Sequence, residues 1–235
     1  MEKQELLYEG KAKKIYRTNE ENVLWIEYKN EATAFNGQKK AKIEGKAVLN
    51  NKISSLLFSQ LHKAGIKTHF IQQLSDQEQL VQKVTIIPIE VVIRNIAAGS
   101  ISQRLGFKEG LKFAQPLVEF YYKNDELGDP LITDDHVLLL ELATTAELEE
   151  IKRQALAVNE VLIPYFQEKN IKLVDFKLEF GRTAAGEIIL ADEISPDTCR
   201  FWDLATNKKL DKDVFRRDLG KLTDAYNEIL TRIGG

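Results

Sequence analysis

The sequence contains little cysteine, histidine and proline, and it has no long hydrophobic run. Cys199 is the only cysteine, so no disulfide can form within the chain and a reducing, cytoplasmic compartment is expected. The longest apolar stretch, residues 84–93, is interrupted by Pro88 and Glu90 and is far shorter than the roughly 20 residues that span a bilayer. The opening residues, MEKQE, do not resemble the apolar region of a signal peptide, so neither secretion nor membrane insertion is expected.

The charged residues are numerous but nearly balanced. With 33 basic and 36 acidic residues, the net charge is −3, which gives no electrostatic footprint for binding nucleic acid. The three histidines, at positions 62, 69 and 136, do not have the spacing of a zinc site. We therefore expect a globular protein with small-molecule partners, and anionic molecules could still bind locally.

Residues 1–84 are expected to form a small α+β lobe. Short runs with strand character are separated by segments with turn character at 10–11 and 19–22. Residues 47–64 carry apolar side chains near helical period and are followed by Gly65, a suitable helix stop. The strands expected in this lobe lie at 6–8, 14–16, 23–28, 66–74 and 79–84.

Residues 85–235 are expected to form a larger α+β lobe, with a hinge near residue 84. The β-branched run at 85–93 leads into Arg94 and predicts a central strand of this lobe. The other elements expected here are paired strands at 171–180 and 187–193 around a loop at 181–186, and a closing amphipathic helix over 214–229.

A long helix is expected in the middle of this lobe. Thr144 and Glu147 have the spacing of a capping box that opens a helix running toward Lys169. Pro164 lies within this stretch and is expected to kink or divide the helix.

The segment 173–181 (LVDFKLEFG) carries the most chemical information. On a strand, Asp175, Lys177 and Glu179 lie on one face, and large apolar side chains lie on the other. A hairpin would return Asp192 to this neighbourhood, where hard carboxylate oxygens suit Mg²⁺. The simplest register places Asp192 opposite Asp175, so joint metal binding with Glu179 would need a bulge or another register. An ordinary half-exposed strand is the alternative interpretation.

Two lysines near the N-terminus form a candidate phosphate site. Lys11 and Lys13 lie two residues apart after Gly10, so both ammonium groups could project from one strand face. The sequence contains no G-x-x-x-x-G-K-[ST] motif, which excludes a P-loop. A solvated basic hairpin is the alternative interpretation.

A candidate anion site begins at Arg94, which ends an apolar strand. The pair Gly99-Ser100 can cap the short segment 101–105, so free amides and a hydroxyl would be available to an anion. Arg94 adds a planar donor fork, the combination expected for a phosphate monoester, and Arg104 could reach the same place. A plain N-cap beside a surface arginine is the alternative.

Two further loops are polar and contain a proline. Residues 195–200 (SPDTCR) form a second rigid loop, in which Ser195 and Arg200 could complete an anion site opposite Arg94. In residues 123–130 (KNDELGDP), Asp129 precedes the proline and is expected to be held in place. Turn chemistry alone could explain the loop at 123–130.

Segments spread over nearly the whole chain resemble the SAICAR synthetase family. Residues 87–100 (IPIEVVIRNIAAGS) and 173–181 fit the two signature stretches of that family throughout their length. Shorter similar segments lie at 10–13, 123–125, 129–130 and 192–197. The resemblance implies a two-lobed, ATP-grasp-like α+β fold with ATP in the cleft between the lobes, and it implies a homo-oligomer.

The resemblance also implies a reaction. ATP and Mg²⁺ would drive the ligation of L-aspartate to the carboxylate of carboxyaminoimidazole ribonucleotide, giving SAICAR, ADP and phosphate in purine biosynthesis. A carboxylate resists attack until ATP converts it to an acyl phosphate, so no enzyme nucleophile is required. Charge neutralisation, alignment and exclusion of water would provide the catalysis.

The resemblance further assigns roles to individual residues. ATP would be held, with its adenine near the crossover at 82–86, by Lys11, Lys13, Gln82, Lys83, Val84 and Ile86. Magnesium would be bound by Glu179, Asp192 and Asp129. The nucleotide substrate would be bound by Arg94, Ser100, Arg104, Ser195 and Arg200. The reacting groups would be positioned by Asp175, Lys177 and Lys123.

One position departs from the family pattern. Asn36 stands where the family usually has an aspartate before glycine, so it cannot supply a negative charge and is not expected to bind metal. Two other classes of function remain open, a small-molecule kinase that stops at phosphoryl transfer and a regulatory module that senses ATP without turnover. The spread of candidate ligands over at least five segments argues against the regulatory module.

Overall fold

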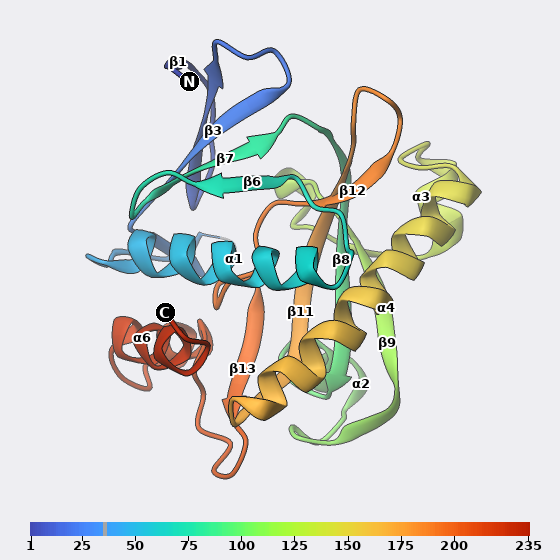
Figure 1. The fold of residues 1–235 in the computed structure, drawn as a ribbon. Helices are drawn as coiled ribbons and strands as arrows, with labels where there is room; N and C mark the ends of the chain where they lie inside the picture. The colour runs from blue at the N-terminus through green and yellow to red at the C-terminus, as the bar shows by residue number, and fades with distance from the viewer. Residues whose placement is uncertain (35–36) are drawn as a thin grey trace.

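The computed structural model describes residues 1–34 and 37–235 and shows two sheets with helices packed beside them (Figure 1). Asn36, the departure from the family pattern, lies outside the described residues. The mixture of helices and antiparallel sheets confirms the expected α+β class.

The first sheet is built entirely from the N-terminal part of the chain. Its strand order is β1-β2-β3-β7-β6, and its pairings are antiparallel. The strands are β1 (Lys3–Glu9), β2 (Lys13–Thr18), β3 (Val23–Tyr28), β6 (Phe70–Gln73) and β7 (Glu78–Gln82). A separate ribbon is formed by β4 (Glu31–Ala34) and β5 (Lys39–Lys42).

The helix expected at 47–64 is present as α1 (Lys46–Lys63). Ile53, Leu57 and Leu61 on this helix are fully buried, whereas Val48 and Leu56 are half-buried. The helix lies between the first sheet and the C-terminal helix α6 (Leu222–Arg232) (Figure 1). Because α1 shares one continuous hydrophobic cluster with the second sheet, the two parts of the chain have a common core.

The second sheet contains the strands that follow residue 84, and its order is β10-β9-β8-β11-β12, with β13 also paired to β11. The strands are β8 (Thr85–Ile96), β9 (Lys112–Tyr122), β10 (Leu131–Ile132), β11 (Ile171–Arg182), β12 (Ile188–Ala191) and β13 (Cys199–Asp203). The long strands β8 and β11 are neighbours at its centre. The change of sheet at residue 84 coincides with the predicted boundary, which stays a prediction.

The long helix α4 (Thr145–Glu168) crosses the second sheet (Figure 1). The capping box between Thr144 and Glu147 is confirmed. Of the two outcomes expected at Pro164, a kink or a division, division does not occur, because the helix is continuous through this residue. Pro164 and Glu160, whose carbonyl loses its intrahelical partner, both lie on the exposed side, where water can satisfy that carbonyl.

The single closing helix expected at 214–229 is also wrong. Two helices occupy this part of the chain, α5 (Asp213–Arg216) and α6. Between them Asp218 and Gly220 have positive φ angles of 52° and 144°, which a continuous helix does not allow. The remaining short helices are α2 (Ser100–Leu105), η1 (Asp125–Leu127) and α3 (Asp134–Leu139).

Within residues 1–34 and 37–235, no helix combines the length and the apolar character that a membrane crossing requires.

Candidate functional site

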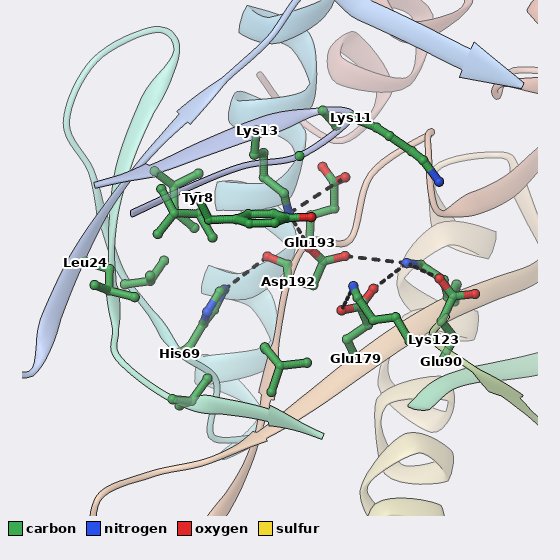
Figure 2. Close-up of a pocket in the computed structure, with 18 of the residues that line it drawn as sticks. Tyr8, Lys11, Lys13, Leu24, His69, Glu90, Lys123, Glu179, Asp192 and Glu193 are labelled. Atoms are coloured by element: carbon green, nitrogen blue, oxygen red, sulfur yellow. Dashed lines mark hydrogen bonds and ion pairs between the residues drawn. The ribbon is translucent and has the colours of Figure 1, made fainter. Parts of the chain in front are cut away.

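A cavity of about 620 Å³ lies between the first sheet and the central strands of the second (Figure 2). One end is apolar and is lined by Leu24, Ile26 and Val81, together with Val84 and Ile86 from the crossover between the sheets. The opposite end is lined by charged side chains, namely Lys11, Lys13, Glu90, Lys123, Asp125, Asp129, Lys177, Glu179, Asp192 and Glu193. An apolar slot that opens onto a cluster of charges suits a nucleotide, with a flat base at one end and phosphates at the other.

Strand β11 orders the polar groups of this site. Asp175, Lys177 and Glu179 alternate along it, and Asp175 pairs with Arg94 while Glu179 pairs with Glu90 across the boundary with β8. Because alternate residues share a face and each residue advances about 3.3 Å, Asp175 and Glu179 lie about 13 Å apart along the strand. The expectation that these three side chains share one face is consistent with this register.

The register between β11 and β12 differs from the simplest one predicted. Glu179 pairs with Ala191, so Asp192 follows directly and lies beside Glu179 instead of opposite Asp175. Strand β11 continues through Gly181 to Arg182, so Gly181 does not start the loop as expected. A Cβ atom at this position would lie 2.5 Å from the Cγ2 atom of Val84, so the missing side chain makes room for the crossover.

Three carboxylates surround the ammonium group of Lys177. Its Nζ atom lies 2.6 Å from Glu179 Oε1, 3.0 Å from Glu90 Oε1 and 3.8 Å from Asp192 Oδ2. Burial alone would lower the pKa of Lys177, but the three carboxylates outweigh burial and raise it well above its ordinary value. Lys177 is therefore a fixed positive charge, not a proton acceptor.

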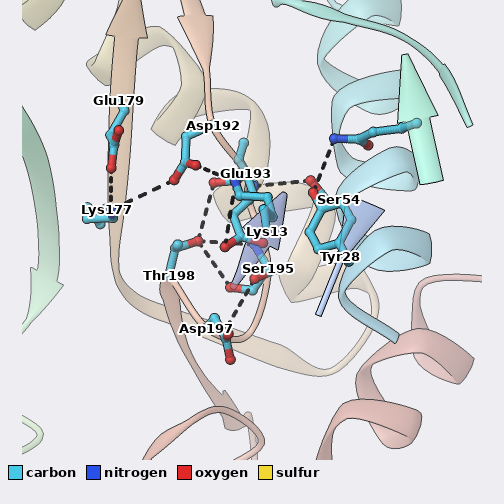
Figure 3. Close-up of polar contacts among 12 residues, drawn as sticks. Lys13, Tyr28, Ser54, Lys177, Glu179, Asp192, Glu193, Ser195, Asp197 and Thr198 are labelled. Atoms are coloured by element: carbon cyan, nitrogen blue, oxygen red, sulfur yellow. Dashed lines mark hydrogen bonds and ion pairs between the residues drawn. The ribbon is translucent and has the colours of Figure 1, made fainter. Parts of the chain in front are cut away.

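Lys13 forms the second positive centre. It forms an ion pair with Asp192, and Glu193 Oε1 lies 3.9 Å from its Nζ atom. Burial would raise the pKa of Asp192, but Lys13 and Lys177 hold it below its ordinary value. The polar cluster continues inward from Glu193 toward the buried Asp197 (Figure 3).

The two other predicted lysines pair with carboxylates at the edge of the cavity. Lys123 Nζ lies 2.5 Å from Glu179 Oε2, and Lys11 Nζ lies 2.6 Å from Asp125 Oδ1. Lys11 precedes β2 in a bend, so the expectation that it shares a strand face with Lys13 is wrong, although both side chains line the cavity.

The carboxylates fit a hard divalent cation in chemical type. Glu179 and Asp192 meet at the same lysine and supply oxygen ligands, so a cation bound there would compete with the Lys177 ammonium. Asp129 lines the same cavity, where its Oδ1 atom accepts the backbone N–H of Asn124 at 2.9 Å. Among the described residues, no three acidic, histidine or cysteine side chains are already grouped around one point as metal ligands.

An arginine cluster lies at the Asp175 end of the strand. Arg94 donates from Nη1 to Asp175 at 2.9 Å and from Nη2 to the Ser100 hydroxyl at 2.9 Å, and Arg200 donates from Nη1 to Asp175 at 2.9 Å. Arg104 joins the cluster through Glu119. Gly99 is the N-cap of α2 and Ser100 is its first residue, so the expected cap lies at Gly99 of the pair and involves no side-chain hydrogen bond.

Two predicted site residues lie apart from both groups. Ser195 is fully buried, and its hydroxyl accepts the backbone N–H of Asp197 at 3.1 Å, which is the chemistry of a turn. Lys83 is exposed and does not line the cavity, whereas Gln82 does.

Several residues of the site were not predicted from the sequence. Glu90 and Glu193 line the cavity, and His69 donates from Nε2 to the backbone oxygen of Asp192 at 3.1 Å. Burial and the nearby Lys13 lower the pKa of His69 to about 3, so it is neutral. Glu90 had a visible signal, since it places a charge inside an otherwise apolar strand.

Comparison with known proteins gives one consistent family. The family model described as SAICAR synthetase matches residues 6–233. Phosphoribosylaminoimidazole-succinocarboxamide synthase of Anoxybacillus flavithermus is 63% identical over 235 residues, which are 100% of this chain and 98% of that protein.

Solved structures agree with this result. The crystal structure of phosphoribosylaminoimidazole-succinocarboxamide synthase from Ehrlichia chaffeensis is 51% identical with a TM-score of 0.95, covering 97% of this chain and 98% of that one. A SAICAR synthetase in complex with ADP is also 51% identical, with a TM-score of 0.94 and 97% of each chain covered. The expected ATP-grasp-like α+β fold is confirmed by these neighbours.

Proposed function

Since the chain belongs to the SAICAR synthetase family, we propose that the cavity and the arginine cluster together form the active site of its reaction. The protein is an ATP-dependent ligase of purine biosynthesis that joins L-aspartate to the carboxylate of carboxyaminoimidazole ribonucleotide. The observation that carries the site assignment is the spacing along β11. The arginine pair contacts Asp175 of this strand, and Lys177 and Glu179, further along it, line the cavity.

ATP occupies the cavity in this proposal. Its adenine lies in the apolar slot beside Val84 and Ile86, and the crossover at 82–86 supplies backbone groups to the base, Lys83 included. Its phosphates face Lys11 and Lys13. The ADP complex of a 51% identical relative supports nucleotide binding by this fold.

The nucleotide substrate lies along β11. Its 5′-phosphate binds at Arg94, Ser100 and Arg200, with Arg104 behind them. The roughly 13 Å from Asp175 to Glu179 accommodates a nucleoside monophosphate whose base carboxylate reaches Lys177. We leave Ser195 out of this site, because its hydroxyl is used within its own turn.

Magnesium is proposed at Glu179 and Asp192, with Asp129 at the cavity edge. When bound, it would neutralise charge on the transferring phosphoryl group. Lys11, Lys13 and Lys123 add positive charge around the same end of the cavity, and they stabilise the charge that develops on the phosphate oxygens.

The reaction proceeds through an acyl phosphate in this proposal. A carboxylate oxygen of the nucleotide attacks the γ-phosphorus of ATP, and ADP leaves. The amine of L-aspartate then attacks the acyl carbon, the carbon–oxygen bond to phosphate breaks, and the amine loses a proton. Lys177, Lys123 and Asp175 position the reacting groups, and no enzyme nucleophile takes part.

We also propose a cytoplasmic location, since Cys199 is a free thiol, and a homo-oligomeric assembly by analogy with the family.

The test is ADP release by the purified protein with Mg²⁺, ATP and carboxyaminoimidazole ribonucleotide, with and without L-aspartate, while the product is followed by mass. Aspartate-dependent release together with the succinocarboxamide mass supports the ligase. Release that does not depend on aspartate, with a phosphorylated product, would identify a kinase instead.

A further inference from the structure

The two arginines of the anion site are held in the same way. Arg94 donates from Nε to Glu119 at 2.6 Å and from Nη1 to Asp175 at 2.9 Å. Arg200 donates from Nε to Asp213 at 3.0 Å and from Nη1 to Asp175 at 2.9 Å. Each guanidinium is therefore fixed on two sides by carboxylates, and Asp175 is shared between them.

The third nitrogen of each fork points toward the same place. Arg94 Nη2 donates to the Ser100 hydroxyl at 2.9 Å. Arg200 Nη2 lies against Gly99, where an added Cβ atom would be only 2.3 Å away. Arg94 Nη2 also donates to the Tyr121 hydroxyl at 3.2 Å. The Nη2 atoms of both arginines therefore lie at the Gly99–Ser100 turn, where a phosphate group could take the place of neutral partners and bind through several donors.

The outer carboxylates are themselves anchored. Arg104 forms an ion pair with Glu119, and Arg216 Nη1 lies 2.7 Å from Asp213 Oδ1. Four arginines against three carboxylates leave one positive charge in the network. Its middle is buried, since 3% of the Arg94 side chain and 4% of the Asp175 side chain are exposed. Its ends are not, since 31% of the Arg104 side chain and 29% of the Arg216 side chain are exposed.

Asp213 is also tied to the strand that bears Arg200. The buried Asp211 accepts the backbone N–H of Phe201 at 2.8 Å and that of Asp213 at 2.7 Å. The first turn of α5 is thereby fastened to β13, one residue after Arg200. A carboxylate at position 213 is needed to hold the Nε atom of Arg200 and so to orient its guanidinium, whereas packing alone does not require one.

We propose that Glu119 and Asp213 are positioning residues for the nucleotide substrate, acting by aiming Arg94 and Arg200 at its phosphate. This inference rests on the proposed function, which places that phosphate at the arginine pair. Without the charge of the outer carboxylate, each guanidinium loses the contact that fixes its Nε atom, so it can tilt about its contact with Asp175 and the two donor edges converge less well.

The test uses the variants Asp213→Asn and Glu119→Gln, which keep the shape of the side chain and remove its charge. Loss of one charge-assisted hydrogen bond should raise the KM for the nucleotide by about ten- to a hundredfold. The KM values for ATP and L-aspartate should stay close to wild type, and kcat should fall much less than kcat/KM for the nucleotide. The conservative variant Asp213→Glu should recover part of the lost affinity.

Asp203→Asn is the matched control. Asp203 ends the same strand, β13, about 10 Å along it from Arg200, and its Oδ2 atom lies 2.8 Å from Arg232. The variant therefore breaks a comparable arginine–aspartate pair that does not include Arg94 or Arg200. It should leave all three KM values unchanged. If Asp213→Asn and Glu119→Gln lower the melting temperature as Asp203→Asn does but leave the nucleotide KM unchanged, the inference is wrong.

A binding measurement separates this inference from the proposed function. Inorganic phosphate titrated against each variant by calorimetry should bind the wild type and Asp203→Asn alike, and Asp213→Asn and Glu119→Gln more weakly. If the wild type shows no aspartate-dependent turnover, the proposed function fails, while the phosphate titration still decides the role of the two carboxylates. Equal phosphate affinity in all four proteins would overturn the inference.

Discussion

Replacing Gly99 by alanine should weaken the binding of the nucleotide substrate at the arginine pair. Gly99 has φ 61° and ψ −130°, a region that residues with a side chain rarely adopt, and such strain costs about 1–3 kcal/mol. The new Cβ atom would also lie 2.3 Å from Nη2, 2.7 Å from Cζ and 3.0 Å from Nη1 of Arg200.

The guanidinium cannot tolerate this contact. An ordinary contact begins near 3.4 Å, so Nη2 must retreat by about 1.1 Å, the difference between 3.4 Å and 2.3 Å. A movement of that size breaks hydrogen bonds of 2.9–3.0 Å to Asp175 and Asp213. Each hydrogen bond to a charged group contributes about 1.5–3 kcal/mol, so the KM for the nucleotide should rise by about ten- to a hundredfold.

The assay is steady-state kinetics with each substrate varied in turn, together with thermal unfolding. Gly106→Ala is the matched control, because Gly106 ends the same helix with φ 72° but an added Cβ atom there has nothing within 4 Å. The control should lose stability through backbone strain without a change in any KM. If Gly99→Ala behaves like Gly106→Ala in the nucleotide KM, the reasoning about Arg200 is refuted.

Three other predictions concern the charged groups. Lys177→Met removes the positive charge at the centre of three carboxylates and should lower kcat by about a hundredfold or more while ATP still binds in calorimetry; a near-wild-type kcat would contradict its role. The Arg182 guanidinium lowers the pKa of Glu147 to about 2, so the stability from this carboxylate is complete above about pH 4.5 and is lost as the pH falls toward 2. Glu147→Gln should therefore lower the free energy of unfolding by about 1 kcal/mol at pH 7. On acidification the variant should lose less stability than the wild type, which urea unfolding at several pH values would show. Lys46→Met removes the ammonium group 2.5 Å from the Asp197 carboxylate, which keeps the Tyr226 hydroxyl at 2.5 Å and Lys212 at 3.7 Å. It should lower the free energy of unfolding by about 3 kcal/mol in the same assay, and a loss below about 1 kcal/mol, the contribution of an exposed ion pair, would count against it.

The sequence predicted the elements of the fold better than their pairing. Alternation along residues 173–181 correctly indicated a strand with Asp175, Lys177 and Glu179 in alternate positions. The partner of Glu179 could not be read in the same way, because alternation has a period of two and defines a face but not a register. The strand also continues through Gly181, where the missing side chain makes room for Val84, a contact between segments far apart in the sequence.

The residues that the sequence did not reveal are those whose role depends on partners from other strands. Nothing in the local sequence marks Glu119 or Asp213 as a site residue. Their role depends on β9 and α5, which bring them to the Nε atoms of Arg94 and Arg200. Ser195 shows the opposite case. A serine beside a proline and an arginine suggested an anion ligand, but its hydroxyl is used by the turn itself.

The central claim is that ATP activates the carboxylate of the nucleotide inside this cleft, and an isotope measurement tests it most directly. Carboxyaminoimidazole ribonucleotide labelled with ¹⁸O in both carboxylate oxygens is turned over with ATP and L-aspartate, and the released phosphate is examined by mass. An acyl phosphate predicts one ¹⁸O in each phosphate and one in the amide of the product. Phosphate without ¹⁸O, formed at the same rate as the succinocarboxamide, would contradict it.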